Sequence, residues 1–157
     1  MFKSFDINLH TGKPLNIFLA EDDYDDCYLF QYTLKEMNRS FHLTTVKNGE
    51  DLMNLLNEET TTLPDFIFLD INMPRKNGFE CLKEIKANAS LCHLPVIVLS
   101  TSYTPVIGEQ LYKQGAQYYI RKPNDVIQFQ KVIEYVLTML ARQNEQRPAF
   151  EDFVVPI

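Results

Sequence analysis

The stretch "DFIFLDINMP", residues 65–74, decides the fold, because an apolar run ends in one carboxylate and a turn. Four successive apolar residues without polar alternation are typical of a strand buried on both faces. Residues 15–20 and 96–99 have the same character, and residues 41–46 and 117–120 also have strand length. The sequence therefore predicts five strands, at residues 15–20, 41–46, 65–69, 96–99 and 117–120.

Apolar residues at helical spacing lie between and after these strands, within residues 27–37, 52–56, 79–86, 106–112 and 126–140. Alternating strands and helices predict an α/β fold with a parallel sheet and helices on both faces. A short sheet of this kind commonly has strand order 2-1-3-4-5, with ligands bound where the winding reverses. We expect a doubly wound, five-stranded parallel sheet.

Length and charge restrict the classes of protein. The 157 residues predict one domain at residues 15–142, an N-terminal leader at residues 1–14 and a C-terminal tail at residues 143–157. A net charge of −6 argues against nucleic-acid binding, which needs clustered basic residues. Three widely spaced cysteines argue against disulfides and zinc, and no apolar run approaches the roughly 20 residues of a membrane span. We expect a cytoplasmic protein without membrane insertion.

Polar residues follow the predicted strands at their carboxyl ends. Glu21 and Asp22 follow the first strand, Asp70 the third, Ser100 the fourth and Lys122 the fifth. Because the carboxyl ends of parallel strands meet at one edge of the sheet, these side chains should share one crevice.

The acidic members of this set predict a metal site. Crowded carboxylates repel each other, so they take up a proton or hold a cation, and Mg²⁺ uses one or two carboxylates with several waters. We interpret Asp22 as the main ligand, Glu21 as a ligand through water, and Asp70 and the backbone carbonyl of Asn72 as further ligands. Asp23, Asp25 and Asp26 are better explained as residues of the first helical turn.

Phosphoryl transfer fits the same crevice, since it depends mainly on positioning and charge neutralisation. Carboxylates can act as nucleophiles and form aspartyl phosphates. On this interpretation Asp70 is the phosphoacceptor, and Lys122 and Ser100 bind phosphoryl oxygens.

The ordered set "EDD", "LDINMPRKNG", "LSTS" and "RKP" resembles the receiver domains of two-component response regulators over about residues 15–140. The resemblance implies a flavodoxin-like fold and Mg²⁺-dependent phosphoryl transfer from a histidine kinase or histidine phosphotransfer protein to Asp70. It also implies a cis bond before Pro123 and a switch in which Ser100 moves toward the phosphate and Tyr119 rotates inward. The surface of residues 105–114 would then contact a downstream protein effector or a second copy of the chain. More narrowly, the motifs resemble stand-alone regulators paired with bacterial phytochromes.

Two other functions use similar residues. A small Mg²⁺-dependent phosphohydrolase would also form an aspartyl phosphate, but it typically carries a second Asp two residues beyond the nucleophile, where this chain has Asn72. An amide cannot shuttle a proton, so hydrolysis should be slow. A flavin-binding module would need a hydroxyl- and glycine-rich loop after the first strand, and "AEDDYDD" is opposite in charge.

Overall fold

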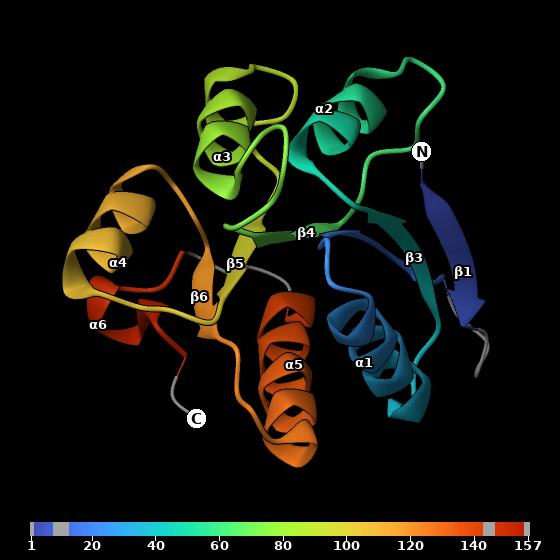
Figure 1. Ribbon diagram of the computed structural model, residues 1–157. Coiled ribbons are helices and arrows are strands. Elements are labelled where there is room, and N and C mark those ends of the chain that lie inside the picture. The colour runs from blue at the N-terminus through green and yellow to red at the C-terminus, as the bar shows by residue number, and fades with distance from the viewer. Residues whose placement is uncertain (1, 8–12, 143–146, 156–157) are drawn as a thin grey trace.

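A computed structural model describes residues 2–7, 13–142 and 147–155 and shows a six-stranded sheet flanked by helices (Figure 1). The strands lie in the order β1-β3-β2-β4-β5-β6. Five of them are parallel and confirm the predicted order 2-1-3-4-5. These are β2 (Leu15–Ala20), β3 (Phe41–Val46), β4 (Phe66–Asp70), β5 (Val96–Ser100) and β6 (Tyr118–Arg121).

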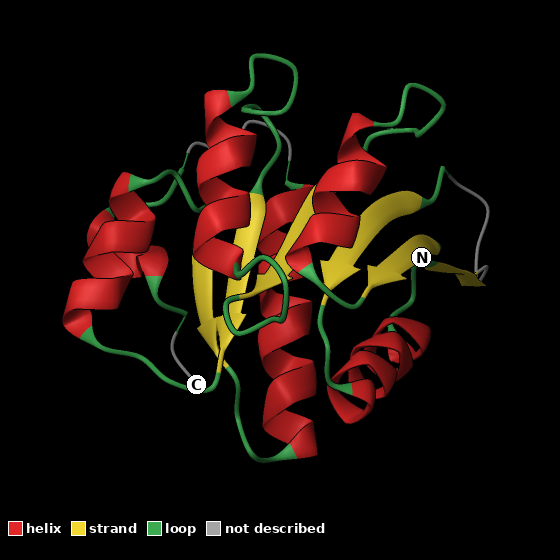
Figure 2. Cartoon of the chain, turned by 45° about the horizontal axis from the view of Figure 1, so that its top comes forward, coloured by secondary structure: helices red, strands yellow, loops and turns green. Residues whose placement is uncertain are grey.

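Helices cover both faces of the sheet, as predicted (Figure 2). One face packs against α1 (Tyr24–Glu36) and α5 (Val126–Ala141). The other packs against α2 (Gly49–Asn57), α3 (Gly78–Ala87) and α4 (Pro105–Lys113). Within β2, Ile17 and Leu19 face the first layer, whereas Phe18 and Ala20 face the second. Because both sets are buried, the strand is apolar from Ile17 to Ala20.

The five long helices begin at polar capping residues. In each, the side chain accepts a hydrogen bond from the amide three positions later, which satisfies a donor that has no partner within the helix. The caps are Asp23, Asn48, Asn77, Thr104 and Asp125. Four of these caps lie at the carboxyl-terminal edge of the sheet shortly after a strand, and the predicted role of Asp23 as a residue of the helix start is confirmed.

A sixth strand corrects the predicted count of five. β1 (Lys3–Ile7) lies within the predicted leader and pairs antiparallel with β3, so that Phe5 is opposite Leu43. Phe5 packs against the layer of α1 and α5, while Lys3 and Asp6 are exposed. Among the side chains described in this edge strand, Phe5 is partly buried and Lys3, Ser4 and Asp6 are exposed, so there is little hydrophobic periodicity, which explains the error. Residues 8–12 of the predicted leader lie outside the described part of the chain.

The C-terminal segment also contributes to the fold. Residues 147–155 contain the short helix α6 (Phe150–Phe153), which lies beside α4 (Figure 1). Phe153 and Val155 are buried. Residues 143–146 and 156–157 of the predicted tail are outside the described ranges. Among the described helices, none has the length and apolar character needed to cross a membrane.

Candidate functional site

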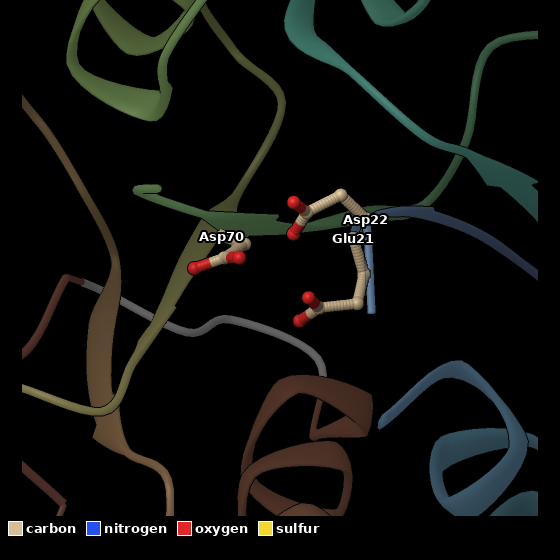
Figure 3. Close-up of side chains that lie close together, drawn as sticks. All are labelled: Glu21, Asp22 and Asp70. Carbon is tan, nitrogen blue, oxygen red and sulfur yellow. The ribbon is translucent and has the colours of Figure 1, made fainter. Parts of the chain in front are cut away.

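Three carboxylates meet at the carboxyl ends of two neighbouring strands (Figure 3). Glu21 and Asp22 follow β2, and Asp70 ends β4. The parallel register pairs Ala20 with Leu69, which brings the residues after both strands side by side. One oxygen from each carboxylate lies within 4.8 Å of the other two. The predicted acidic crevice is therefore present, with Glu21 and Asp70 buried and Asp22 exposed.

Burial makes negative charge costly at this point. Desolvation, followed by the charge of Asp70, raises the pKa of Glu21 to about 8, although Lys122 opposes the shift. Desolvation also raises the pKa of Asp70, against the opposing charge of Lys122. Three carboxylates this close together suit a hard divalent cation, whose charge would offset their mutual repulsion. The donor set thus fits the metal type predicted from the sequence.

Lys122 lies in the same crevice, as predicted, but it is shared among three carboxylates. Its Nζ atom is 2.5 Å from Glu21 Oε2, 2.9 Å from Asp26 Oδ2 and 3.7 Å from Asp70 Oδ2. Burial disfavours the ammonium charge, but the hydrogen bond and charge of Glu21 outweigh burial and raise the pKa of Lys122. The lysine is therefore held as a cation beside Asp70.

Asp26 is a member of the site that the sequence analysis assigned only to the helix start. Its side chain is 34% exposed and forms an ion pair with Lys122. Asp26 lies in the first turn of α1, three residues after the cap Asp23. Its place in the acidic run was the available signal, but the contact depends on where the lysine side chain lies.

Ser100 and Tyr119 lie next to each other, as the resemblance implied for the switch pair. Ser100 is buried at the end of β5, and its Oγ accepts a hydrogen bond of 3.3 Å from the amide of Ser102. Tyr119 is fully buried, and its hydroxyl donates to the carbonyl of Ser102. Burial raises the pKa of Tyr119, and a side-chain hydrogen bond with Ser100 opposes the shift. A continuous polar connection thus joins Ser100 to Tyr119.

Two further predicted positions gave different outcomes. Asn72 lies beside the crevice, since its amide donates a 3.3 Å hydrogen bond to Asp70 Oδ1. The predicted cis bond before Pro123 is wrong: the Lys122–Pro123 bond is trans, as are the other described peptide bonds. The trans form is the lower in energy even before proline, by about 0.5–1 kcal/mol, so it prevails here.

Comparison with known proteins agrees with this geometry. The family profile described as "Response regulator receiver domain" matches residues 17–134, three quarters of the chain. This chain belongs to that family. The response regulator Rcp1 of Synechocystis sp. (strain ATCC 27184 / PCC 6803 / Kazusa) is 32% identical over 128 residues, which cover 79% of this chain and 87% of Rcp1.

Three solved receiver structures are similar throughout the domain. The phosphorylated cyanobacterial phytochrome response regulator RcpA has a TM-score of 0.79 at 30% identity, covering 87% of this chain and all of RcpA. The Mn²⁺-bound form of Rcp1 has a TM-score of 0.78 at 30% identity, with the same coverage. The bacteriophytochrome response regulator RtBRR has a TM-score of 0.68 at 27% identity, covering 88% of this chain and 86% of RtBRR.

Family membership assigns the general chemistry of the crevice. Glu21, Asp22 and Asp70 form the acidic pocket of a receiver domain, which supports a divalent cation and phosphorylation. Receiver domains act with histidine kinases. The protein is therefore a signalling phosphoacceptor and not a classical enzyme, and the alternative of a phosphohydrolase is not supported.

Proposed function

We propose that this receiver domain accepts a phosphoryl group on Asp70 from a histidine kinase or a histidine phosphotransfer protein. The observation that carries the proposal is the position of Asp70, which lies within 4.8 Å of two other carboxylates and 3.7 Å from the Lys122 ammonium. Within the described ranges, these three carboxylates form the one group of three or more His, Cys, Asp or Glu side chains close enough to hold a metal ion. Asp70 therefore combines a nucleophilic oxygen with nearby positive charge.

The transfer step is a displacement at phosphorus. A carboxylate oxygen of Asp70 forms a bond to phosphorus while the N–P bond of the donor phosphohistidine breaks, and the electron pair of that bond returns to the imidazole nitrogen. Lys122 provides a fixed ammonium for a phosphoryl oxygen, and the Ser100 hydroxyl provides a hydrogen-bond donor for another. The burial of Asp70 excludes water from one side of the reacting carboxylate.

The cation that fits best is Mg²⁺, held by Glu21, Asp22, Asp70 and the backbone carbonyl of Asn72. All these donors are oxygen atoms, which hard divalent cations prefer. When bound, Mg²⁺ supplies positive charge that offsets the repulsion between the carboxylates and an incoming phosphoryl group. The Mn²⁺-bound structure of Rcp1 supports a divalent cation in this type of pocket.

Phosphorylation would act on the remainder of the protein through Ser100 and Tyr119. The added charge of about −1.5 to −2 attracts the Ser100 hydroxyl, which also contacts Tyr119. We infer that this biases the loop after β5 and helix α4, whose surface a downstream protein effector or a second copy would recognise. The similarity to RcpA and RtBRR supports a phytochrome-type histidine kinase as the donor.

Intact mass spectrometry tests the proposal. The protein is incubated with acetyl phosphate and Mg²⁺, beside Asp70→Asn and the control Asp25→Asn, which removes an exposed carboxylate of the same acidic region. We expect one phosphoryl adduct on the natural chain and on Asp25→Asn, and none on Asp70→Asn. An adduct on Asp70→Asn would refute the assigned acceptor, and rapid release of inorganic phosphate would favour a phosphohydrolase.

A further inference from the structure

The C-terminal segment, residues 147–155, docks along β6, at the opposite edge of the sheet from β1 (Figure 1). Val154 forms a parallel bridge with Tyr119, and the amide of Val155 donates a 2.9 Å hydrogen bond to the carbonyl of Tyr119. An edge strand has backbone groups available for pairing with another segment. Here Val154 and Val155 of the same chain pair with Tyr119 and so occupy part of the free edge of β6.

Aromatic packing holds this segment against α4. The ring centroids of Phe153 and Phe150 each lie 5.2 Å from that of Tyr112 on α4. Phe153 is fully buried, whereas Phe150 remains 42% exposed. Polar contacts add specificity, since the Tyr112 hydroxyl donates to the carbonyl of Pro148 over 3.0 Å.

Arg147 attaches the start of the segment. Its Nε atom donates a 3.0 Å hydrogen bond to the carbonyl of Ala116, which precedes β6. Its guanidinium group lies 3.8 Å from the centroid of the Tyr112 ring, close enough for a cation–π contact. The segment is therefore attached at both ends, by Arg147 and by the bond from Val155 to Tyr119.

The docked segment contacts the residue proposed as the switch. The Tyr119 ring has two aromatic neighbours, with ring centroids 5.2 Å away for Tyr103 in the loop after β5 and 6.4 Å away for Phe153. Its hydroxyl donates to Ser102 of that loop. Rotation of Tyr119 out of the core would break the contact with Phe153 together with this hydrogen bond. Docking of the segment therefore favours the inward position of Tyr119.

We propose that residues 147–155 form a latch that closes on the inward position of Tyr119 and thereby stabilises the phosphorylated state. The inference rests on the proposed function, in which phosphorylation draws Ser100 toward Asp70 and keeps Tyr119 inward. When phosphorylation and docking of the segment favour the same conformation, each makes the other more favourable by the same free energy. Phosphorylation should tighten the latch, and the latch should increase the affinity of the pocket for a phosphoryl group.

Hydrogen exchange measures the first half of this coupling. The probe is the Val155 amide, because its bond to Tyr119 exists only when the latch is docked. Beryllofluoride with Mg²⁺ serves as the phosphoryl mimic. We expect exchange at Val155 to slow by at least threefold on addition of the mimic. An unchanged or faster rate, in a protein that binds the mimic, overturns the latch.

Matched variants measure the reverse direction. Phe153→Ala removes the side chain that contacts Tyr119, whereas Phe150→Ala removes a neighbouring ring that contacts Tyr112 and Phe153. Titration with beryllofluoride should show a loss of affinity of at least threefold for Phe153→Ala and a smaller loss for Phe150→Ala. Equal affinities in both variants and in the natural chain contradict the coupling. If Phe153→Ala does not fold, Arg147→Ala releases the segment without opening the core.

Other outcomes remain distinct. Failure of the natural chain to form an aspartyl phosphate or to bind the mimic overturns the proposed function itself. Normal phosphorylation with no response at Val155 overturns the latch alone. Protection of Val155 that increases with protein concentration shows that the segment docks on a second copy, which also overturns the intramolecular latch.

Discussion

Neutralising Asp22 should stabilise the metal-free protein while abolishing its response to Mg²⁺. Asp22 is the exposed member of the three-carboxylate cluster. Lys122 forms ion pairs with Glu21, Asp26 and Asp70, and no described ion pair joins it to Asp22. Asp22→Asn therefore removes the repulsion of Asp22 by Glu21 and Asp70 without breaking any of these ion pairs.

The Coulomb energy sets the size of this effect. At the 4.8 Å limit of the cluster, two like charges repel by about 0.9 kcal/mol in water and about 3.5 kcal/mol at an effective dielectric constant of 20. Because Asp22 is exposed, the value in water is appropriate for each of its two pairs, and above about pH 8, where Glu21 is also ionised, the two pairs give about 2 kcal/mol in all. For a chain of this length that is an increase of roughly 4–8 °C in Tm.

The assay is thermal unfolding of the natural chain, Asp22→Asn and Asp25→Asn, each in a chelator and in excess Mg²⁺. Asp25 is a suitable control because it belongs to the same acidic stretch, is exposed and lies outside the metal-binding cluster. Mg²⁺ at 100 times its Kd should stabilise the natural chain and Asp25→Asn by about 2.7 kcal/mol, and Asp22→Asn hardly at all. A lower Tm for Asp22→Asn in chelator, or an intact Mg²⁺ response, would refute the reasoning.

Three further outcomes can be measured directly. The pKa of Glu21 is about 8 in the folded chain against an ordinary 4.5, so between these pH values the folded state holds a proton that the unfolded chain loses. The Tm of the metal-free protein should therefore fall as the pH rises from about 4.5 to 8, while the increase in Tm caused by Mg²⁺ grows. A Tm that does not change with pH would contradict this. In Gly78→Ala the new Cβ would lie 2.5 Å from the Asp70 carbonyl oxygen, so urea unfolding should show a loss of about 1–3 kcal/mol, and an unchanged midpoint would show that the backbone yields. Burial raises the pKa of the Cys81 thiol to about 12, so peptide mapping after native alkylation should find exposed Cys92 modified and Cys81 intact; equal labelling would contradict the burial.

The central strands were predictable because their environment leaves a simple pattern. Residues 15–20 and 41–46 were predicted to the residue, and the remaining three strands to within one or two positions. A strand covered by helices on both faces buries side chains on both sides, so its sequence is mostly apolar and its polar neighbours mark its ends. β1 has one covered face and one partly buried aromatic residue, so no comparable pattern exists there.

The positions of Glu21, Asp22 and Asp70 were predictable for a topological reason. Each directly follows or ends a strand, so the backbone alone brings them together once the strand order is known. The contact between Asp26 and Lys122 depends instead on the conformations of two side chains, one of them long and flexible. The docking of residues 147–155 was equally hidden, because two phenylalanines and two valines in a polar segment do not specify which surface they cover.

The distribution of charge in the pocket explains why Asp70, and not a neighbour, is suited to act as the nucleophile. Lys122 makes its two shortest contacts with Glu21 and Asp26, and its distance to Asp70 is about an ångström longer than either. A carboxylate in a tight ion pair loses nucleophilicity, because its electron pairs are engaged by the cation. Asp26 therefore helps to hold the ammonium to one side, where it is near enough to attract a phosphoryl oxygen but forms no tight ion pair with Asp70. The acidic stretch after β2 thus supplies the cation-binding carboxylates, the helix cap and the residue that positions the lysine.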